Sequence, residues 1–77
     1  MIAPTYVVSS NIEAAGYALG KLYVLFKTGV AYMYSPVSYT MFDAMVKQES
    51  VGSWFHKNIK TNKDIHYQKL EANPFKS

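Results

Sequence analysis

The sequence predicts an α+β domain in which a three-stranded antiparallel β-meander, preceded by an extended N-terminal segment, packs on two short C-terminal helices. Three observations support this fold. Hydrophobic residues alternate with a period of two in the first half of the chain, turn residues interrupt that alternation, and a helical period replaces it after Pro36. The length of 77 residues suffices for one domain, so we expect residues 1–77 to form a single unit.

The meander is predicted from three runs of β-favouring residues, at positions 12–18, 21–27 and 30–34. Leu19 and Gly20 form a tight turn between the first two runs. Residues 6–9 are expected to be extended and to precede the sheet. The sequence therefore predicts a compact sheet with two tight connections.

Two short helices are predicted in the second half of the chain. Ser38 is a typical N-cap for a helix that ends near Gln48, and Ser50 is expected to cap a second helix over residues 51–58. The apolar residues of the second helix recur at helical spacing, which places them on one face. Each helix therefore has one face suited to packing on the sheet.

The chain becomes polar after Lys60. Ile65 and Tyr67 indicate one more extended segment, and residues 71–77 are expected to form a frayed tail. Cysteine is absent, so disulfides and thiolate metal sites are excluded, and stability must come from aliphatic and aromatic packing.

The loop between the second and third runs decides which side of the sheet Tyr32 and Tyr34 occupy. A two-residue loop of Thr28 and Gly29 would turn both tyrosines away from the helices. A three-residue loop closed by a left-handed Gly29 would turn both toward the helices. Threonine is β-branched and resists the positive φ that a type I′ turn requires, which favours the three-residue loop.

The opposite side of the predicted sheet carries Tyr23, Leu25 and Met33. An apolar face without helices is typical of an interface, so these residues are candidates for contact with a protein partner or a second copy of the chain. The N-terminal or C-terminal segment of the chain is the other possible cover for this face. The sequence leaves both alternatives open.

Charge and hydropathy limit the classes of partner. The net charge is +3 and all eight basic residues are lysine, which suits contact with phosphates but also serves solubility. No apolar run is long enough for a membrane helix, and the N-terminus lacks the features of a signal peptide, so we expect a cytoplasmic protein that does not bind membranes.

The start of the second predicted helix is the candidate anion site. Backbone N–H groups at a helix start are free to bind a phosphate, and a glycine there permits close approach. The residues concerned are Ser50, Gly52, Ser53, His56, Lys57, Lys60 and Lys63. The alternative is an ordinary N-cap, with glycine at a position where a side chain would clash.

Catalytic and metal sites are not predicted. The chain has no Gly-x-Ser-x-Gly motif, and its serines suit turns and caps, so we expect no catalytic residues and no enzymatic activity. His56 and His66 are too far apart for a local metal motif, and no metal or other cofactor is expected. Most aromatic residues, including Tyr32, Tyr34 and Trp54, are assigned to the core.

An ordered set of short motifs resembles the KTSC domain. The resemblance covers residues 8 to about 60. It includes Val8-Ser9-Ser10-Asn11-Ile12, Gly16-Tyr17, Leu22-x-Val24-x-Phe26, Tyr32-x-Tyr34 and Ser50-x-Gly52-x-Trp54-Phe55-His56. Domains of this family occur at the C-terminus of some lysyl-tRNA synthetases and as free-standing bacterial or phage proteins. The resemblance implies a module that accompanies tRNA-handling enzymes and suggests RNA binding.

Two functions follow as expectations. The first is a small binding module for RNA or another nucleic acid, in which Lys57, Lys60, Lys63 and Lys69 meet phosphates. The second is a protein-interaction module, self-associating or binding another protein, that uses the apolar sheet face.

Overall fold

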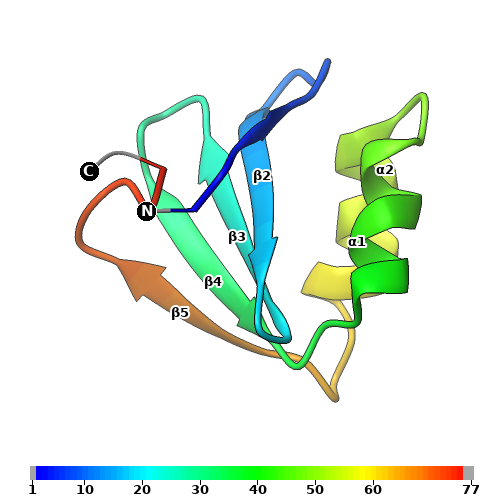
Figure 1. Cartoon of the computed structure of the whole chain (residues 1–77). Coiled ribbons are helices and arrows are strands. Elements are labelled where there is room, and N and C mark those ends of the chain that lie inside the picture. Colours follow the sequence, from blue (N-terminus) through cyan, green and yellow to red (C-terminus); the bar gives the residue numbers. More distant parts are fainter. Residues whose placement is uncertain (1, 76–77) are drawn as a thin grey trace.

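The computed structural model describes residues 2–75 and confirms the α+β class. A single antiparallel sheet carries both helices on one side (Figure 1). Its strand order is β1-β2-β3-β4-β5, so every strand pairs with its neighbours in the sequence. The strands are β1 (Thr5–Tyr6), β2 (Ile12–Ala18), β3 (Lys21–Phe26), β4 (Ala31–Ser35) and β5 (His66–Leu70).

The sheet has five strands, whereas three were expected, because a short strand is added at each edge. β1 is only two residues long, and it overlaps the segment predicted to be extended, residues 6–9, at Tyr6 alone. β5 contains Tyr67 and pairs with β4 in the register Tyr34↔Tyr67. Four of its five residues are exposed, so its side chains lack the alternation that identifies a half-buried strand.

The loop between β3 and β4 has the predicted three-residue form. Phe26 and Val30 close the loop through a backbone hydrogen bond of 2.9 Å, and Gly29 adopts a positive φ of 94°. The register then pairs Leu22 with Tyr34, which places Tyr34 on the helix side of the sheet. The prediction that both tyrosines of β4 face the helices is therefore confirmed.

Helix α1 (Tyr39–Val46) begins where the sequence predicted. The Ser38 hydroxyl accepts a hydrogen bond of 3.2 Å from the Met41 N–H, which satisfies one of the free donors of the first turn. Lys47 is the C-cap, and its side chain forms a salt bridge of 2.8 Å with Asp43.

The second helix differs from its prediction in two respects. Helix α2 (Val51–Phe55) is short and continues as a π-helical turn, η1 (His56–Lys60), in which the Thr61 N–H donates to the His56 carbonyl. Ser50 occupies the N-cap position, but its side chain makes no capping hydrogen bond. Its φ of −112° and ψ of 81° lie outside the usual N-cap conformation, which accounts for the missing bond.

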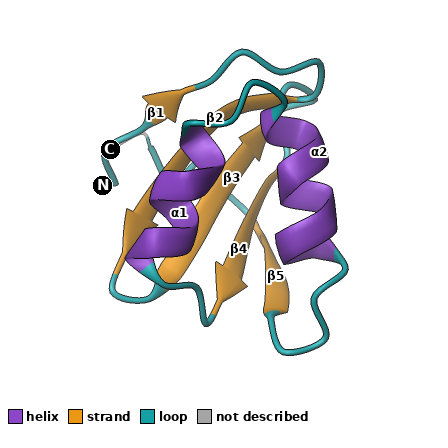
Figure 2. Cartoon of the chain, turned by 90° about the vertical axis from the view of Figure 1, so that its right-hand side faces the viewer, coloured by secondary structure: helices purple, strands orange, loops and turns teal. Residues whose placement is uncertain are grey.

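The hydrophobic core lies between the sheet and the two helices. Figure 2 shows α1 in front of β2, and α2 nearer to β4 and β5. The core unites apolar residues from the inner sheet face and from the helices: Ile12, Ala15, Leu22, Val24, Tyr34, Val37, Phe42, Met45, Val51, Phe55 and Ile59. Trp54, expected in the core, is only half-buried and packs against its margin.

The outer sheet face is covered in part by the two ends of the chain. The Ile2 N–H donates to the Pro74 carbonyl at 3.1 Å, and Phe75 is buried with 8% of its surface exposed. A Cβ atom at Gly16 would lie 2.7 Å from Phe75 Cε1, so glycine allows this contact. The tail that we expected to fray from residue 71 contains this buried phenylalanine, and residues 76–77 lie outside the described part.

Candidate functional site

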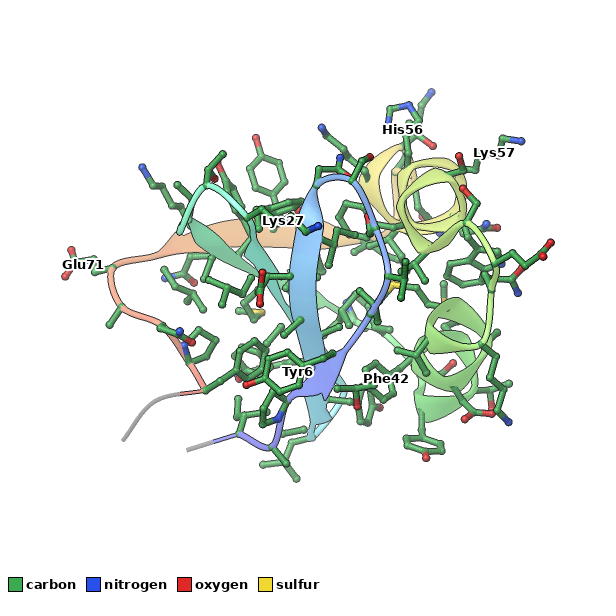
Figure 3. The ribbon with its side chains drawn as sticks, turned by 90° about the horizontal axis from the view of Figure 1, so that it is seen from above. Tyr6, Lys27, Phe42, His56, Lys57 and Glu71 are labelled. Atoms are coloured by element: carbon green, nitrogen blue, oxygen red, sulfur yellow. The ribbon has the colours of Figure 1, made fainter. Side chains whose placement is uncertain are left out.

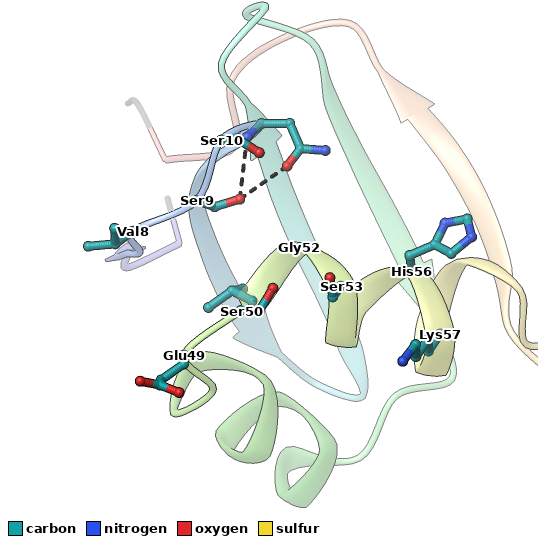
Figure 4. Close-up of a pocket in the computed structure, with 11 residues that line it drawn as sticks. Val8, Ser9, Ser10, Glu49, Ser50, Gly52, Ser53, His56 and Lys57 are labelled. Carbon is teal, nitrogen blue, oxygen red and sulfur yellow. Dashed lines mark hydrogen bonds between the residues drawn. The ribbon is translucent and has the colours of Figure 1, made fainter.

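The loop before β2 is shaped by one serine. The Ser9 hydroxyl accepts hydrogen bonds from the backbone N–H groups of Asn11 and Ile12, at 3.3 and 3.2 Å, and donates to Asn11 Oδ1 at 3.1 Å (Figure 4). Serine hydroxyls commonly close turns in this way. Ser9 is thereby committed to the loop, whereas the Ser10 side chain is exposed.

Gly52 lets the start of α2 approach this loop closely. A Cβ atom at position 52 would lie 3.1 Å from Asn11 Oδ1 and 3.3 Å from Ser9 Oγ. These separations are tighter than most contacts of a Cβ atom, so a larger residue would require the Asn11 and Ser9 side chains to shift by a few tenths of an ångström. The close approach of helix and loop at Gly52 is compatible with both alternatives drawn from the sequence, the anion site and the ordinary N-cap.

A groove of about 590 Å³ opens between the loop and the helix start. We call it the polar groove, and it is lined by Val8, Ser9, Ser10, Asn11, Glu49, Ser50, Val51, Gly52, Ser53, His56 and Lys57. The structure thus brings five of the seven predicted anion-site residues into one concave surface, together with a loop from a distant part of the sequence. Lys60 and Lys63 lie outside this groove.

The acidic and basic residues of the polar groove are separated along its length. Figure 4 shows Glu49 at one end, near α1, and His56 and Lys57 at the other. Both His56 and Lys57 are exposed and point outward from the helical layer (Figure 3). Within residues 2–75 the single salt bridge joins Lys47 to Asp43, so Lys57, Lys60 and Lys63 have no acidic partner there. This end of the groove carries the exposed ammonium group of Lys57.

A second groove of about 600 Å³ lies on the other side of η1. We call it the tyrosine groove, and it is lined by Phe26, Thr28, Val30, Tyr32, Tyr34, Lys60 and Tyr67. Burial, followed by the neighbouring Tyr32 and Tyr67, raises the pKa of Tyr34 to about 12, so its hydroxyl stays protonated at neutral pH. The sequence reasoning missed this groove, because it assigned Tyr32 and Tyr34 to the core.

The three candidate interface residues lie together on the outer sheet face. Tyr23 pairs with Met33, and Leu25 lies two residues along the same strand. All three are half-buried. Gly16, the partner of Tyr23 on β2, contacts the terminal segments, which therefore reach this face.

Within residues 2–75, no three histidine, aspartate or glutamate side chains come close enough together to hold a metal ion. None of the helices in that range is both long and apolar enough to traverse a bilayer.

Comparison with known proteins identifies the domain. The family model of the KTSC domain matches residues 8–62, a range that includes the polar groove and most of the sheet. No curated protein matches the chain. The matched range begins at the loop before β2 and ends just after η1, so both sides of the polar groove lie within the family domain.

Proposed function

The chain belongs to the KTSC domain family, and we propose that it is a non-enzymatic binding module for RNA or another nucleic acid. The ligand backbone follows α2 and η1. The observation that carries this proposal is the placement of two exposed lysines on either side of η1. Lys57 lies in the polar groove and Lys60 in the tyrosine groove. One strand of nucleic acid running across η1 would meet both.

The spacing of these lysines suits a chain of phosphates. Lys57 and Lys60 lie three residues apart on the π-helical turn and border different grooves, so a backbone that crosses η1 would meet one lysine on each side of it. Lys63 follows in the exposed turn after η1 and extends the series. Ser50 and Ser53 supply hydroxyl groups at the other end of the path. Lysines with hydroxyl donors are typical of contacts to a phosphate backbone.

The absence of arginine predicts the kind of recognition. In duplex recognition, guanine is most often contacted by an arginine side chain through two hydrogen bonds, and this chain has no arginine. Lysine contacts to phosphates position a ligand without reading its sequence. We therefore expect binding that depends strongly on salt and weakly on base sequence.

Salt titration of RNA binding tests the proposal. The logarithm of the association constant of the parent protein for a labelled RNA should fall linearly with the logarithm of salt concentration, because each phosphate contact releases counterions. Failure to bind at low salt, or binding that does not respond to salt, would reject the proposed function.

The alternative is a protein-interaction or self-association module that uses Tyr23, Leu25 and Met33. These side chains are contiguous and incompletely buried, which favours a contact surface. Light scattering of the parent protein at high concentration distinguishes the two. A dimer that Leu25→Glu converts to a folded monomer would support this alternative, and a monomeric parent would exclude self-association.

A further inference from the structure

Aromatic rings form the floor of the tyrosine groove, and one of these rings is exposed. Tyr32 lies at its centre, with its ring centroid 6.2 Å from that of Tyr34 in a stacked arrangement and 5.9 Å from that of Tyr67. The three rings differ in exposure: Tyr34 is 5% exposed, Tyr32 is half-buried and Tyr67 is 71% exposed. Tyr34 therefore belongs to the core, whereas Tyr67 offers an uncovered ring surface.

Packing fixes the orientation of this aromatic floor. Phe26 makes an edge-on contact with Tyr32, with centroids 6.0 Å apart, and a second edge-on contact with Phe55 of the core. Tyr34 contacts Phe55 at 5.2 Å. These contacts hold the Tyr32 and Tyr34 rings in place, and the exposed Tyr67 ring packs against both, with centroid distances of 5.9 and 6.4 Å. A planar ligand on Tyr67 would therefore rest on a partly ordered aromatic surface, which limits the entropy lost on binding.

The charges around the tyrosine groove are those that a phosphate-bearing ligand requires. Lys60 lines it from η1, and Lys69 lies opposite Tyr32 in the β4–β5 register and so occupies the same sheet face. None of the described residues that line the groove is acidic. An aromatic floor with one lysine in its lining and a second on the same sheet face matches a planar base attached to phosphates.

We propose that the tyrosine groove is a stacking site for an unpaired nucleobase, with Tyr67 as the exposed platform and Lys60 and Lys69 beside the flanking phosphates. This inference rests on the proposed function and specifies its substrate class as single-stranded nucleic acid. Within a duplex both faces of each interior base are covered by its neighbours, whereas an unpaired base has a face free to lie against the Tyr67 ring.

Substitutions at Tyr67 test the site without disturbing the core. Tyr67→Leu keeps an apolar side chain on the edge strand but removes the aromatic face, and Tyr67→Phe retains that face. Tyr6→Leu is a matched control, because Tyr6 is also 71% exposed but lies on β1, at the other edge of the sheet. Binding of a short labelled single-stranded oligoadenylate at low salt is measured by fluorescence anisotropy for each variant.

Tyr67→Leu should raise the Kd for the oligoadenylate by roughly 5- to 150-fold, whereas Tyr67→Phe and Tyr6→Leu should bind like the parent. The salt dependence of the Tyr67→Leu variant should equal that of the parent, since no phosphate contact is removed. Salt-dependent binding with a Kd that Tyr67→Leu does not change would overturn the stacking site but not the proposed function. No oligoadenylate binding by the parent would overturn both.

Discussion

Gly16→Ala tests the packing of the chain ends on the outer sheet face. The added Cβ would lie 2.7 Å from Phe75 Cε1, 2.8 Å from Ile2 Cγ2 and 2.9 Å from the Ala3 carbonyl oxygen. Gly16 lies within β2, so alanine meets no unusual backbone requirement there and the effect is steric. The Ala3 oxygen belongs to the backbone, so the N-terminal segment must move to relieve the contact.

The expected loss of stability follows from two opposing effects. Inserting a methyl group into a packed site typically costs about 1–3 kcal/mol. Replacing glycine by alanine at a compatible position stabilises the folded state by about 0.4–1 kcal/mol, because alanine restricts the conformations of the unfolded chain. The difference predicts that Gly16→Ala lowers the free energy of unfolding by about 0.5–2 kcal/mol.

A double-mutant cycle assigns this loss to the contact with Phe75. Phe75→Leu removes the ring atom nearest to the added Cβ but keeps an apolar side chain. Urea unfolding, followed by circular dichroism and Trp54 fluorescence, should show that Gly16→Ala costs less in the Phe75→Leu background than in the parent, with a coupling of roughly 0.5 kcal/mol or more. A Gly16→Ala variant as stable as the parent, or exactly additive losses in the cycle, would contradict the packing of the chain ends on Gly16.

Three further predictions concern the core, a helix cap and alkaline pH. Phe55→Ala should lower the free energy of unfolding by about 3–5 kcal/mol and Trp54→Ala by distinctly less, because Phe55 is 3% exposed and Trp54 is half-buried. Equal thermal midpoints of the two variants would contradict this order. Ser38→Ala should lower the free energy of unfolding by about 1 kcal/mol and Ser38→Asp by much less, as measured in urea. Tyr34 has a folded-state pKa of about 12, above its ordinary value. The stability that the protonated Tyr34 hydroxyl contributes is therefore complete below about pH 10 and is lost as the pH rises toward 12. The free energy of unfolding of Tyr34→Phe, measured in urea, should depend less on pH in that range than that of the parent.

Local chemistry explains which parts of the fold were predictable. Thr28 and Gly29 determine the form of the loop between β3 and β4. The side of the sheet on which Tyr32 and Tyr34 lie could therefore be predicted from these two residues. Ser38 likewise marks the start of α1. β5 escaped prediction as a sheet strand because its exposed side chains carry no alternation, and its place depends on pairing with β4.

The candidate site was predictable only where it is local in sequence. Ser50 through Lys57 lie in one helical segment, so their proximity followed from periodicity. The contact of Gly52 with the loop before β2 is tertiary, and no local pattern indicates it. The tyrosine groove depends on the register between Tyr34 and Tyr67, which joins two segments separated by both helices.

The salt dependence of RNA binding by Lys57→Gln/Lys60→Gln tests the central claim most directly. Each lysine is exposed and borders one of the two grooves, so the double variant should fold normally and lose two phosphate contacts. The log–log slope for a single-stranded RNA should then become shallower by about 1.4, at about 0.7 for each contact. Lys21→Gln, at the exposed start of β3, provides a control that lowers the net charge away from η1 and should leave the slope unchanged. A double variant with the slope of the parent would show that nucleic acid does not follow η1.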